Sequence, residues 1–146
     1  MTYTISRLEK PEDFTEDVIK FLREVMPKIS EMYNNKLDFR YCKPELLAKH
    51  GIFLICRRDG EITGQHISNL SICPLDLSKR ILQQVHFYVK PDSGRTAYHL
   101  FKEFLDIGKS EADHIITMLT SQTNIKASTL ENMGFEELET LYRLEV

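Results

Sequence analysis

The spacing of hydrophobic residues in the first third of the chain predicts a strand followed by two helices. Residues 2–7 alternate apolar and polar side chains, as a short strand does. From Pro11 onward apolar residues recur every three or four positions, which predicts an amphipathic helix. Pro27 is expected to end or kink this helix, although the apolar face continues for about one further turn. Residues 44–50 fit a second, shorter helix.

The middle of the chain has the pattern of a β-hairpin followed by another strand. Residues 51–58 and 61–72 read as strands joined by Asp59-Gly60, a strong two-residue turn signal. After a connection of sequence Cys-Pro-Leu-Asp-Leu-Ser, residues 80–90 are predicted to form a third strand. Strict alternation places three of its apolar residues on one face, namely Val85, Phe87 and Val89.

The last third alternates between helical and strand patterns. Apolar residues spaced for one helix face predict a helix over residues 96–107 that stops near Gly108. Residues 114–120 form a strand pattern, residues 124–133 a helix ended by Gly134, and residues 135–145 a terminal strand.

This order of elements predicts an α/β (mixed α+β) fold. Strand 80–90, helix 96–107 and strand 114–120 match a right-handed βαβ crossover with parallel strands, whereas the other neighbouring strands are mostly joined by hairpins. We therefore expect a mixed, mostly antiparallel sheet with a central parallel βαβ unit and helices on both faces, within a single domain of residues 1–146.

Composition narrows the function classes. The net charge is −3 and the basic residues are scattered, which argues against nucleic acid as a partner. The longest apolar run, residues 52–56, is too short to span a membrane, and the N-terminus lacks the apolar region of a signal peptide. These features predict a cytoplasmic protein without a membrane partner.

The cysteines and histidines do not form a metal-binding pattern. The three cysteines, Cys42, Cys56 and Cys73, include no Cys-x-x-Cys pair, so we expect reduced and mostly structural thiols. The five histidines lack the spacings of common zinc sites. We expect no metal.

The loop from Asp92 to Ala97 connects a predicted strand to the N-terminus of a predicted helix. Such a helix end presents free N–H groups and the positive end of the helix dipole, which together bind phosphate. Gly94 permits close backbone approach, Arg95 adds a guanidinium and Thr96 a hydroxyl, whereas Ala97 is small enough to leave room. Taken alone, the loop is either an anion site or a plain turn.

Three segments in order resemble the GNAT acyltransferase superfamily. They are Asp-Gly-Glu-Ile-Thr-Gly at 59–64, Val-x-Pro at 89–91 with the following loop and helix, and Asn124-x-x-Ala-x-x-Leu-x-x-x-Gly-Phe. The resemblance implies acetyl-CoA as cofactor, with the pantetheine arm on the backbone of Phe87, Tyr88 and Val89 and beside the helix that begins at Asn124. It also implies that the pyrophosphate lies on Gly94, Arg95, Thr96 and Ala97.

The sequence departs from the family pattern in the loop and in the last helix. The loop is about two residues short and lacks a second glycine, which resembles the small, divergent GNAT proteins encoded by tailed bacteriophages and implies the host cytoplasm. Leu130 stands where many members have a tyrosine that protonates the leaving thiolate. Tyr142 or a water would replace that acid, unless Tyr142 is simply a buried sheet aromatic.

The family's usual place for a general base is the strand before the loop. His86 is the side chain there with a pKa near neutrality, suited to removing a proton from an ammonium. A bulge in this strand would move the His86 side chain to the opposite face of the sheet. His86 is therefore either the base or a structural histidine, and His66 is a second candidate.

Two functions from different classes follow from the resemblance. One is an acetyl-CoA-dependent N-acetyltransferase acting on an amine of a small molecule or protein, whose acceptor cleft would involve residues 28–43 and 71–79. The alternative is a catalytically inactive GNAT-fold binding or structural protein, for example phage-encoded and acting on a host factor or in the virion. Either a monomer or a homodimer is expected. An unrelated α/β binding domain would be exposed if strands 80–90 and 114–120 were not parallel neighbours.

Overall fold

One five-stranded sheet with helices on both faces organises the chain. The computed structural model describes residues 1–33, 43, 46, 48, 49, 51–119, 123, 125–138 and 144. In chain order the elements are β1 (Tyr3–Leu8), the short 3₁₀ helix η1 (Pro11–Asp13), α1 (Glu16–Tyr33), β2 (Ile52–Arg58), β3 (Glu61–Cys73), β4 (Asp76–Val89), α3 (Thr96–Glu111), β5 (His114–Ile116) and α4 (Ala127–Asn132).

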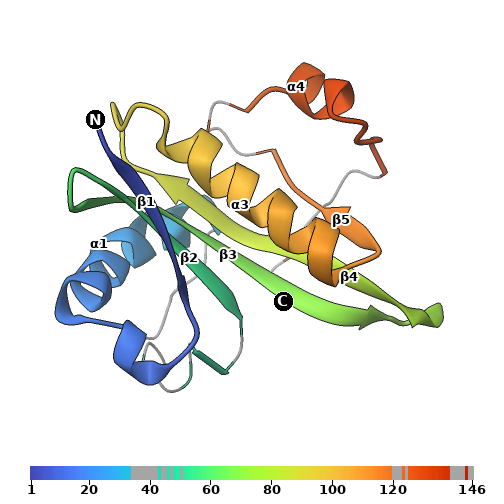
Figure 1. Cartoon of the computed structure of the whole chain (residues 1–146), viewed down its shortest axis with the longest axis horizontal. Helices are drawn as coiled ribbons and strands as arrows, with labels where there is room; N and C mark the ends of the chain where they lie inside the picture. The colour runs from blue at the N-terminus through green and yellow to red at the C-terminus, as the bar shows by residue number, and fades with distance from the viewer. Residues whose placement is uncertain are drawn as a thin grey trace.

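The strands lie in the sheet in the order in which they occur in the chain, β1-β2-β3-β4-β5. The first three pairs are antiparallel, whereas β4 and β5 are parallel and are joined through α3 (Figure 1). This confirms the predicted mixed sheet and its βαβ crossover, which lies at the β5 edge of the described sheet. β4 and β5 are parallel neighbours, so the arrangement that would have indicated an unrelated α/β domain is not the one observed.

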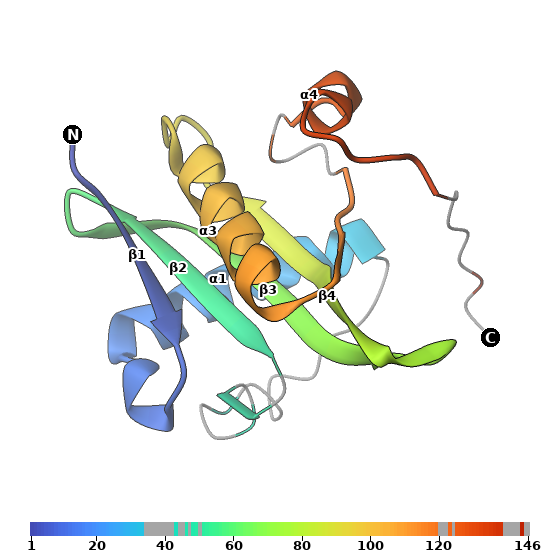
Figure 2. The same cartoon turned by 45° about the vertical axis from the view of Figure 1, so that its right-hand side comes forward.

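Each face of the sheet carries its own hydrophobic core. On one face, α1 buries Val18, Phe21, Leu22 and Val25 against the sheet. On the other, α3 packs Leu100, Phe101 and Phe104 against β2 and β4. Figure 2 shows α3 in front of the sheet and α1 behind it. The 3.6-residue spacing of apolar residues thus places both helices, because each buries one apolar stripe.

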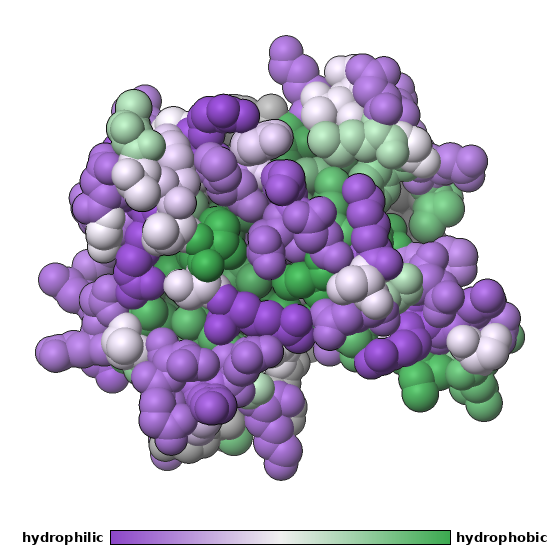
Figure 3. Space-filling view, viewed as in Figure 1, coloured by the Kyte–Doolittle hydropathy of each residue, from purple (hydrophilic) through white to green (hydrophobic). Residues whose placement is uncertain are grey.

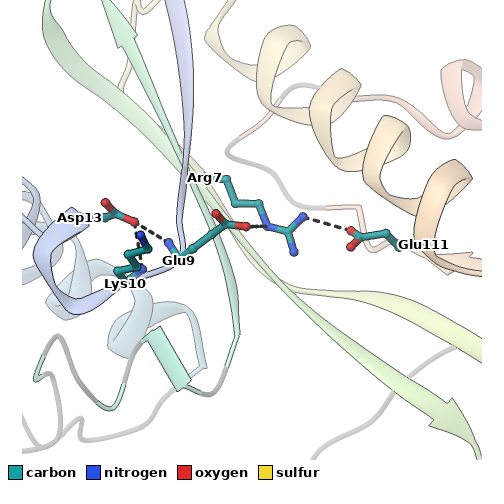
Figure 4. A network of polar contacts seen from close by, with 5 residues as sticks. All are labelled: Arg7, Glu9, Lys10, Asp13 and Glu111. Atoms are coloured by element: carbon teal, nitrogen blue, oxygen red, sulfur yellow. Dashed lines mark hydrogen bonds and ion pairs between the residues drawn. The ribbon is translucent and has the colours of Figure 1, made fainter.

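Polar contacts tie β1 to the elements on either side of it. The Arg7 guanidinium donates to Glu111 at the end of α3, with 3.1 Å between nitrogen and oxygen, and also lies 3.5 Å from Glu9 (Figure 4). The Asp13 carboxylate accepts from the backbone amides of Glu9 and Lys10 at the start of η1. These contacts fix the path of the chain from β1 into the first helices.

Three helix ends in α1 and α3 differ from the sequence prediction. Pro11 opens η1 rather than the long helix, and α1 runs on through Pro27 to Tyr33. Gly108 lies inside α3, which ends three residues later. A β-carbon at Gly108 would lie 2.4 Å from Ile115 and 3.3 Å from Leu82, so this glycine lets the helix approach the sheet closely.

The β3–β4 hairpin is longer than predicted. β4 begins at Asp76 rather than residue 80, because Pro74 and Leu75 alone form the turn. The extended end exposes Ile72, Leu75 and Leu77, and Figure 3 shows apolar atoms at this end of the molecule, at lower right. Part of the segment predicted as an irregular connection is therefore a strand.

The C-terminal third fits the prediction less well. β5 covers only His114–Ile116, whereas 117–119 are not a strand. Helix α4 begins at Ala127 instead of residue 124, although Gly134 follows it with a positive φ of 93° as predicted. Residues 135–138 are not a strand, and most of the predicted terminal strand lies outside the described residues. The described part of the predicted 44–50 helix, Leu46, Ala48 and Lys49, is helical.

Candidate functional site

A bulge in β4 changes which side chains face each core. Ile67 of β3 pairs with His86, but the next residue, Ser68, pairs with Gln84, so Val85 is an extra residue in β4. Val85 is half exposed, whereas Phe87 is buried against α3. The prediction that Val85, Phe87 and Val89 share one face is therefore wrong for Val85, because the bulge reverses the alternation between them.

β4 and β5 separate at this bulge. β5 pairs with β4 only through Ile81, Leu82 and Gln83. Beyond that point the Gln84 side chain spans the gap, since its Oε1 accepts from the Thr117 hydroxyl at 2.7 Å and its Nε2 donates to the Met118 carbonyl at 3.3 Å. Gln84 is buried, so its amide takes the place of backbone pairing where the strands fork.

Past the fork, β4 has one free edge within the described part of the chain. The Lys90 amide donates to the Thr63 carbonyl of β3 at 2.8 Å. Because antiparallel pairing alternates along a strand, the amides of Phe87 and Val89 point away from β3, toward the side that β5 has left. No described residue accepts from either amide. An extended ligand can add to such an edge as a further strand does.

The loop between β4 and α3 is held by two residues from β1 and β2. Tyr3 and Arg58 are paired across these strands. The Tyr3 hydroxyl accepts from the Arg95 amide at 3.0 Å, and the Arg58 guanidinium donates to the Asp92 carbonyl at 3.1 Å. Neither residue stands out in the sequence, although Arg58 directly precedes the predicted hairpin turn. These contacts fix a short loop that lacks the family's second glycine.

Thr96 has a structural position in this loop. It is fully buried, and its hydroxyl donates to the Ser93 carbonyl and lies 2.8 Å from the Thr63 hydroxyl. Gly94 has a φ of 63°, and a β-carbon there would lie 2.3 Å from the Tyr3 hydroxyl, so the turn requires glycine. The Thr96 hydroxyl proposed for the anion is thus engaged within the protein.

Two backbone amides at the start of α3 remain available to donate hydrogen bonds to a ligand. The amides of Ala97 and Tyr98 donate to no other residue that the structure describes, as is usual in a first helical turn. The exposed Arg95 guanidinium lies over the Tyr98 ring, 4.5 Å from its centre. Two free amides and one cation at a helix N-terminus suit a phosphate group. Asn124, predicted to lie beside the same ligand, falls outside the described residues.

The two candidate histidines lie on opposite faces of the sheet. His86 shares the α1 face with Tyr88, whereas His66 contacts Phe87 and Phe104 on the α3 face. Burial lowers the pKa of His86 to about 4, and burial together with neighbouring His86 lowers the pKa of His66 to about 3. Both imidazoles are therefore neutral at pH 7, and neither can readily remove a proton from an ammonium.

α4, as the structure describes it, contains no tyrosine that could take the place of the acid found in many GNAT proteins. Leu130 is buried in the core beneath α3. Tyr142, the predicted substitute, lies outside the described residues. The described residues also contain no cluster of metal-ligating side chains. Among the helices that the structure describes, none is long and apolar enough to cross a membrane.

Known structures share this architecture. No protein-family profile matches the sequence, and no curated protein does. An aminoglycoside acetyltransferase from an uncultured soil metagenomic sample is 15% identical, with a TM-score of 0.69 over 100% of this chain and 99% of that one.

Two further known structures have the same architecture as this chain. A ribosomal-protein-alanine N-acetyltransferase from Brucella melitensis is 16% identical, with a TM-score of 0.69 and 99% of each chain covered. A predicted acetyltransferase with acetyl-CoA from Clostridium acetobutylicum is 12% identical, with a TM-score of 0.66 over 99% of this chain and 96% of that one. The chain therefore has the fold of the GNAT acetyltransferases.

Proposed function

We propose that this protein is an acetyl-CoA-dependent N-acetyltransferase that acts on a primary amine. The observation that carries the proposal is the free edge of β4 next to the start of α3. The unpaired amides of Phe87 and Val89 and those of Ala97 and Tyr98 lie at the two ends of one connecting loop. A ligand with an extended amide-containing arm and a phosphate end fits both, and acetyl-CoA has these parts.

The chain would hold acetyl-CoA mainly through its backbone. The β4 edge binds the amide groups of the pantetheine arm, and the start of α3 binds the pyrophosphate with help from Arg95. Acetyl-CoA supplies a thioester whose carbonyl carbon bonds to the amine nitrogen as the bond to sulfur breaks; the amine loses a proton and the released thiolate gains one. A β4 amide that donates to the thioester carbonyl stabilises the charge that develops on its oxygen.

Catalysis would depend on positioning rather than on a strong acid or base. Leu130 cannot donate a proton, and the neutral His86 is too weak a base for an ammonium. Holding the amine next to the thioester supplies much of the rate, since it replaces a bimolecular encounter. The structures that share this fold include an aminoglycoside acetyltransferase and a ribosomal-protein-alanine N-acetyltransferase. Transfer of an acetyl group to an amine by these proteins supports the same class of reaction here.

Calorimetric titration with acetyl-CoA and with CoA tests the proposal. We expect micromolar affinity for both in the full chain. Arg95→Glu should weaken it at least tenfold, because it places a negative charge beside the phosphates. Lys102→Glu makes the same charge change on an exposed part of α3 and should leave the affinity within about twofold.

Thr96 is not a suitable position for such a variant, because it is fully buried and its replacement would disrupt the loop itself. No binding of either nucleotide at millimolar concentration would overturn the proposal. That result would favour the alternative, a GNAT-fold binding protein without catalysis, for which Leu130 and the Tyr3 contact to the Arg95 amide are the supporting observations.

A further inference from the structure

The start of α3 carries a cation stacked on an exposed aromatic ring. The Arg95 guanidinium carbon lies 4.5 Å from the centre of the Tyr98 ring, a contact that the three-residue spacing along a helix allows. Arg95 is exposed and Tyr98 is half exposed. Among the described residues, no carboxylate forms an ion pair with Arg95. This stack of Arg95 on Tyr98 therefore presents a positive charge and a flat surface to solvent.

Contacts with β1 and within α3 hold the stack in place. The Tyr3 hydroxyl accepts from the Arg95 amide at 3.0 Å, and the Tyr3 ring stacks on His99 with 4.6 Å between ring centres. His99 in turn meets the Tyr98 ring edge-on, with 5.3 Å between centres. The start of α3 accordingly lies beside the N-terminal end of β1 (Figure 1). Because these contacts already order both residues, a ligand that binds to them loses less affinity to conformational entropy.

Tyr98 also belongs to the proposed phosphate site through its backbone. Its amide and that of Ala97 donate to no other described residue. In CoA only a ribose separates the diphosphate from the adenine base. A base whose phosphates lie on the amides of α3 is therefore within reach of the stack.

We infer that the adenine base of CoA stacks on the Arg95 guanidinium, with the Tyr98 ring beneath it, so that these two residues select a cofactor that carries a base. The inference rests on the proposed function, under which CoA binds at this helix. Nucleobases stack on guanidinium planes and aromatic rings, and one such contact contributes roughly tenfold or more to affinity. Stacking uses only the face of the guanidinium, so its N–H groups remain available to the phosphates.

A purely supporting role for Tyr98 predicts a different result. If the ring only held the Arg95 guanidinium near the phosphates, its loss would weaken every ligand with a diphosphate to the same degree. A stacking role weakens only those ligands that carry a base. A CoA analogue without the base separates the two roles, because it keeps all of the phosphates.

The test is calorimetric titration of the full chain with CoA, with its hypoxanthine analogue, and with an abasic analogue in which hydrogen replaces adenine. We expect the hypoxanthine analogue to bind within about threefold of CoA, since any purine offers a face for stacking, and the abasic analogue to bind roughly tenfold more weakly. Tyr98→Ala should weaken CoA binding about tenfold and leave binding of the abasic analogue within about twofold. Tyr98→Phe keeps the ring and should behave as the unmodified chain does. Leu75→Ala, which truncates an exposed side chain in the turn between β3 and β4, is the matched control and should change nothing.

Arg95→Lys gives an independent check, because it keeps the positive charge but removes the planar group. It should weaken binding of CoA at least about threefold more than binding of the abasic analogue. Equal affinity for CoA and the abasic analogue, or an equal loss for both in Tyr98→Ala, would overturn the inference and leave the proposed function standing. Failure of CoA to bind the unmodified chain would overturn the proposed function and this inference with it.

Discussion

The two halves of β4 have the same backbone but different neighbours. Ile81, Leu82 and Gln83 lie between β3 and β5 and pair with both. Past the bulge, the stretch from His86 to Val89 pairs with β3 alone among the described strands. One half is the interior of a sheet, and the other is an edge that can accept a ligand.

Two local devices produce this difference. The extra residue Val85 bends the strand and reverses its faces, and the Gln84 amide bonds to Thr117 and Met118 where backbone pairing stops. In this chain the bulge and the Gln84 amide occur together where β5 leaves β4, and the amide satisfies the Met118 carbonyl at the fork. The buried histidines also lie in or beside the open half, where His66 pairs with Phe87.

The largest effect should come from acid. The pKa values of His66 and His86 are lowered from 6.5 in the unfolded chain to about 3 and about 4 by burial. Between these values the unfolded chain binds more protons, so stability falls as pH decreases below about 6.5. From pH 7 to pH 5 we expect a loss of about 2 kcal/mol per histidine, measured by urea unfolding.

Two variants distinguish the open half of β4 from the closed half in the pH dependence of unfolding. His66→Leu should remove about half of the acid dependence. Ser71→Ala changes an exposed residue of β3 that pairs with the closed half at Ile81 and removes no titratable group, so it should leave the dependence as it is. An unfolding free energy that stays constant from pH 7 to pH 5 would contradict the burial of both imidazoles.

Overpacking at the end of the open half should have the next largest effect. Gly64 pairs with Val89, and a β-carbon on it would lie 2.7 Å from the Thr96 side chain and 2.9 Å from the Tyr88 carbonyl. Gly64→Ala should lose about 2 kcal/mol of unfolding free energy, because the backbone carbonyl cannot move away easily. Ser71→Ala, at an exposed position of β3, is the control; a loss below about 0.5 kcal/mol for Gly64→Ala would be inconsistent with this packing.

The smallest of these effects concerns the fork itself. Gln84→Leu leaves the Met118 carbonyl and the Thr117 hydroxyl without their partner and should cost about 1–2 kcal/mol in unfolding free energy. The neighbouring Gln83→Leu changes the same residue type in the closed half, where the side chain is exposed, and should be nearly neutral. Equal effects for the two glutamines would mean that Gln84 does not join the strands at the fork.

The sequence predicts the strands and helices better than it predicts their contacts. The β2–β3 hairpin follows from Asp59-Gly60, which adopts positive φ at both positions, and the βαβ unit follows from the change of apolar period. The bulge at Val85 does not follow, because Val is a common strand residue and the offset depends on pairing with β3. The early start of β4 does not follow from the sequence either, since a two-residue turn at Pro74 and Leu75 leaves no polar loop to detect.

In the candidate site, too, the sequence predicts the local structure but not the contacts between distant segments. Gly94 and Arg95 lie at the loop as predicted, because the strand-to-helix pattern is local. The contribution of Tyr3 and Arg58 comes from strands distant in sequence, and the buried position of Thr96 depends on Thr63. The binding roles of these residues, the catalytic role of His86 and the phage-type assignment stay predictions.

The central claim is that CoA binds along the open half of β4, and amide chemical shifts at residue resolution test it most directly. Titration of the labelled full chain with CoA should shift the amides of Phe87, Val89, Ala97 and Tyr98 and protect them from hydrogen exchange. The amides of residues 81–83 should stay unchanged. Shifts confined to other parts of the molecule, or none at millimolar CoA, would contradict the account.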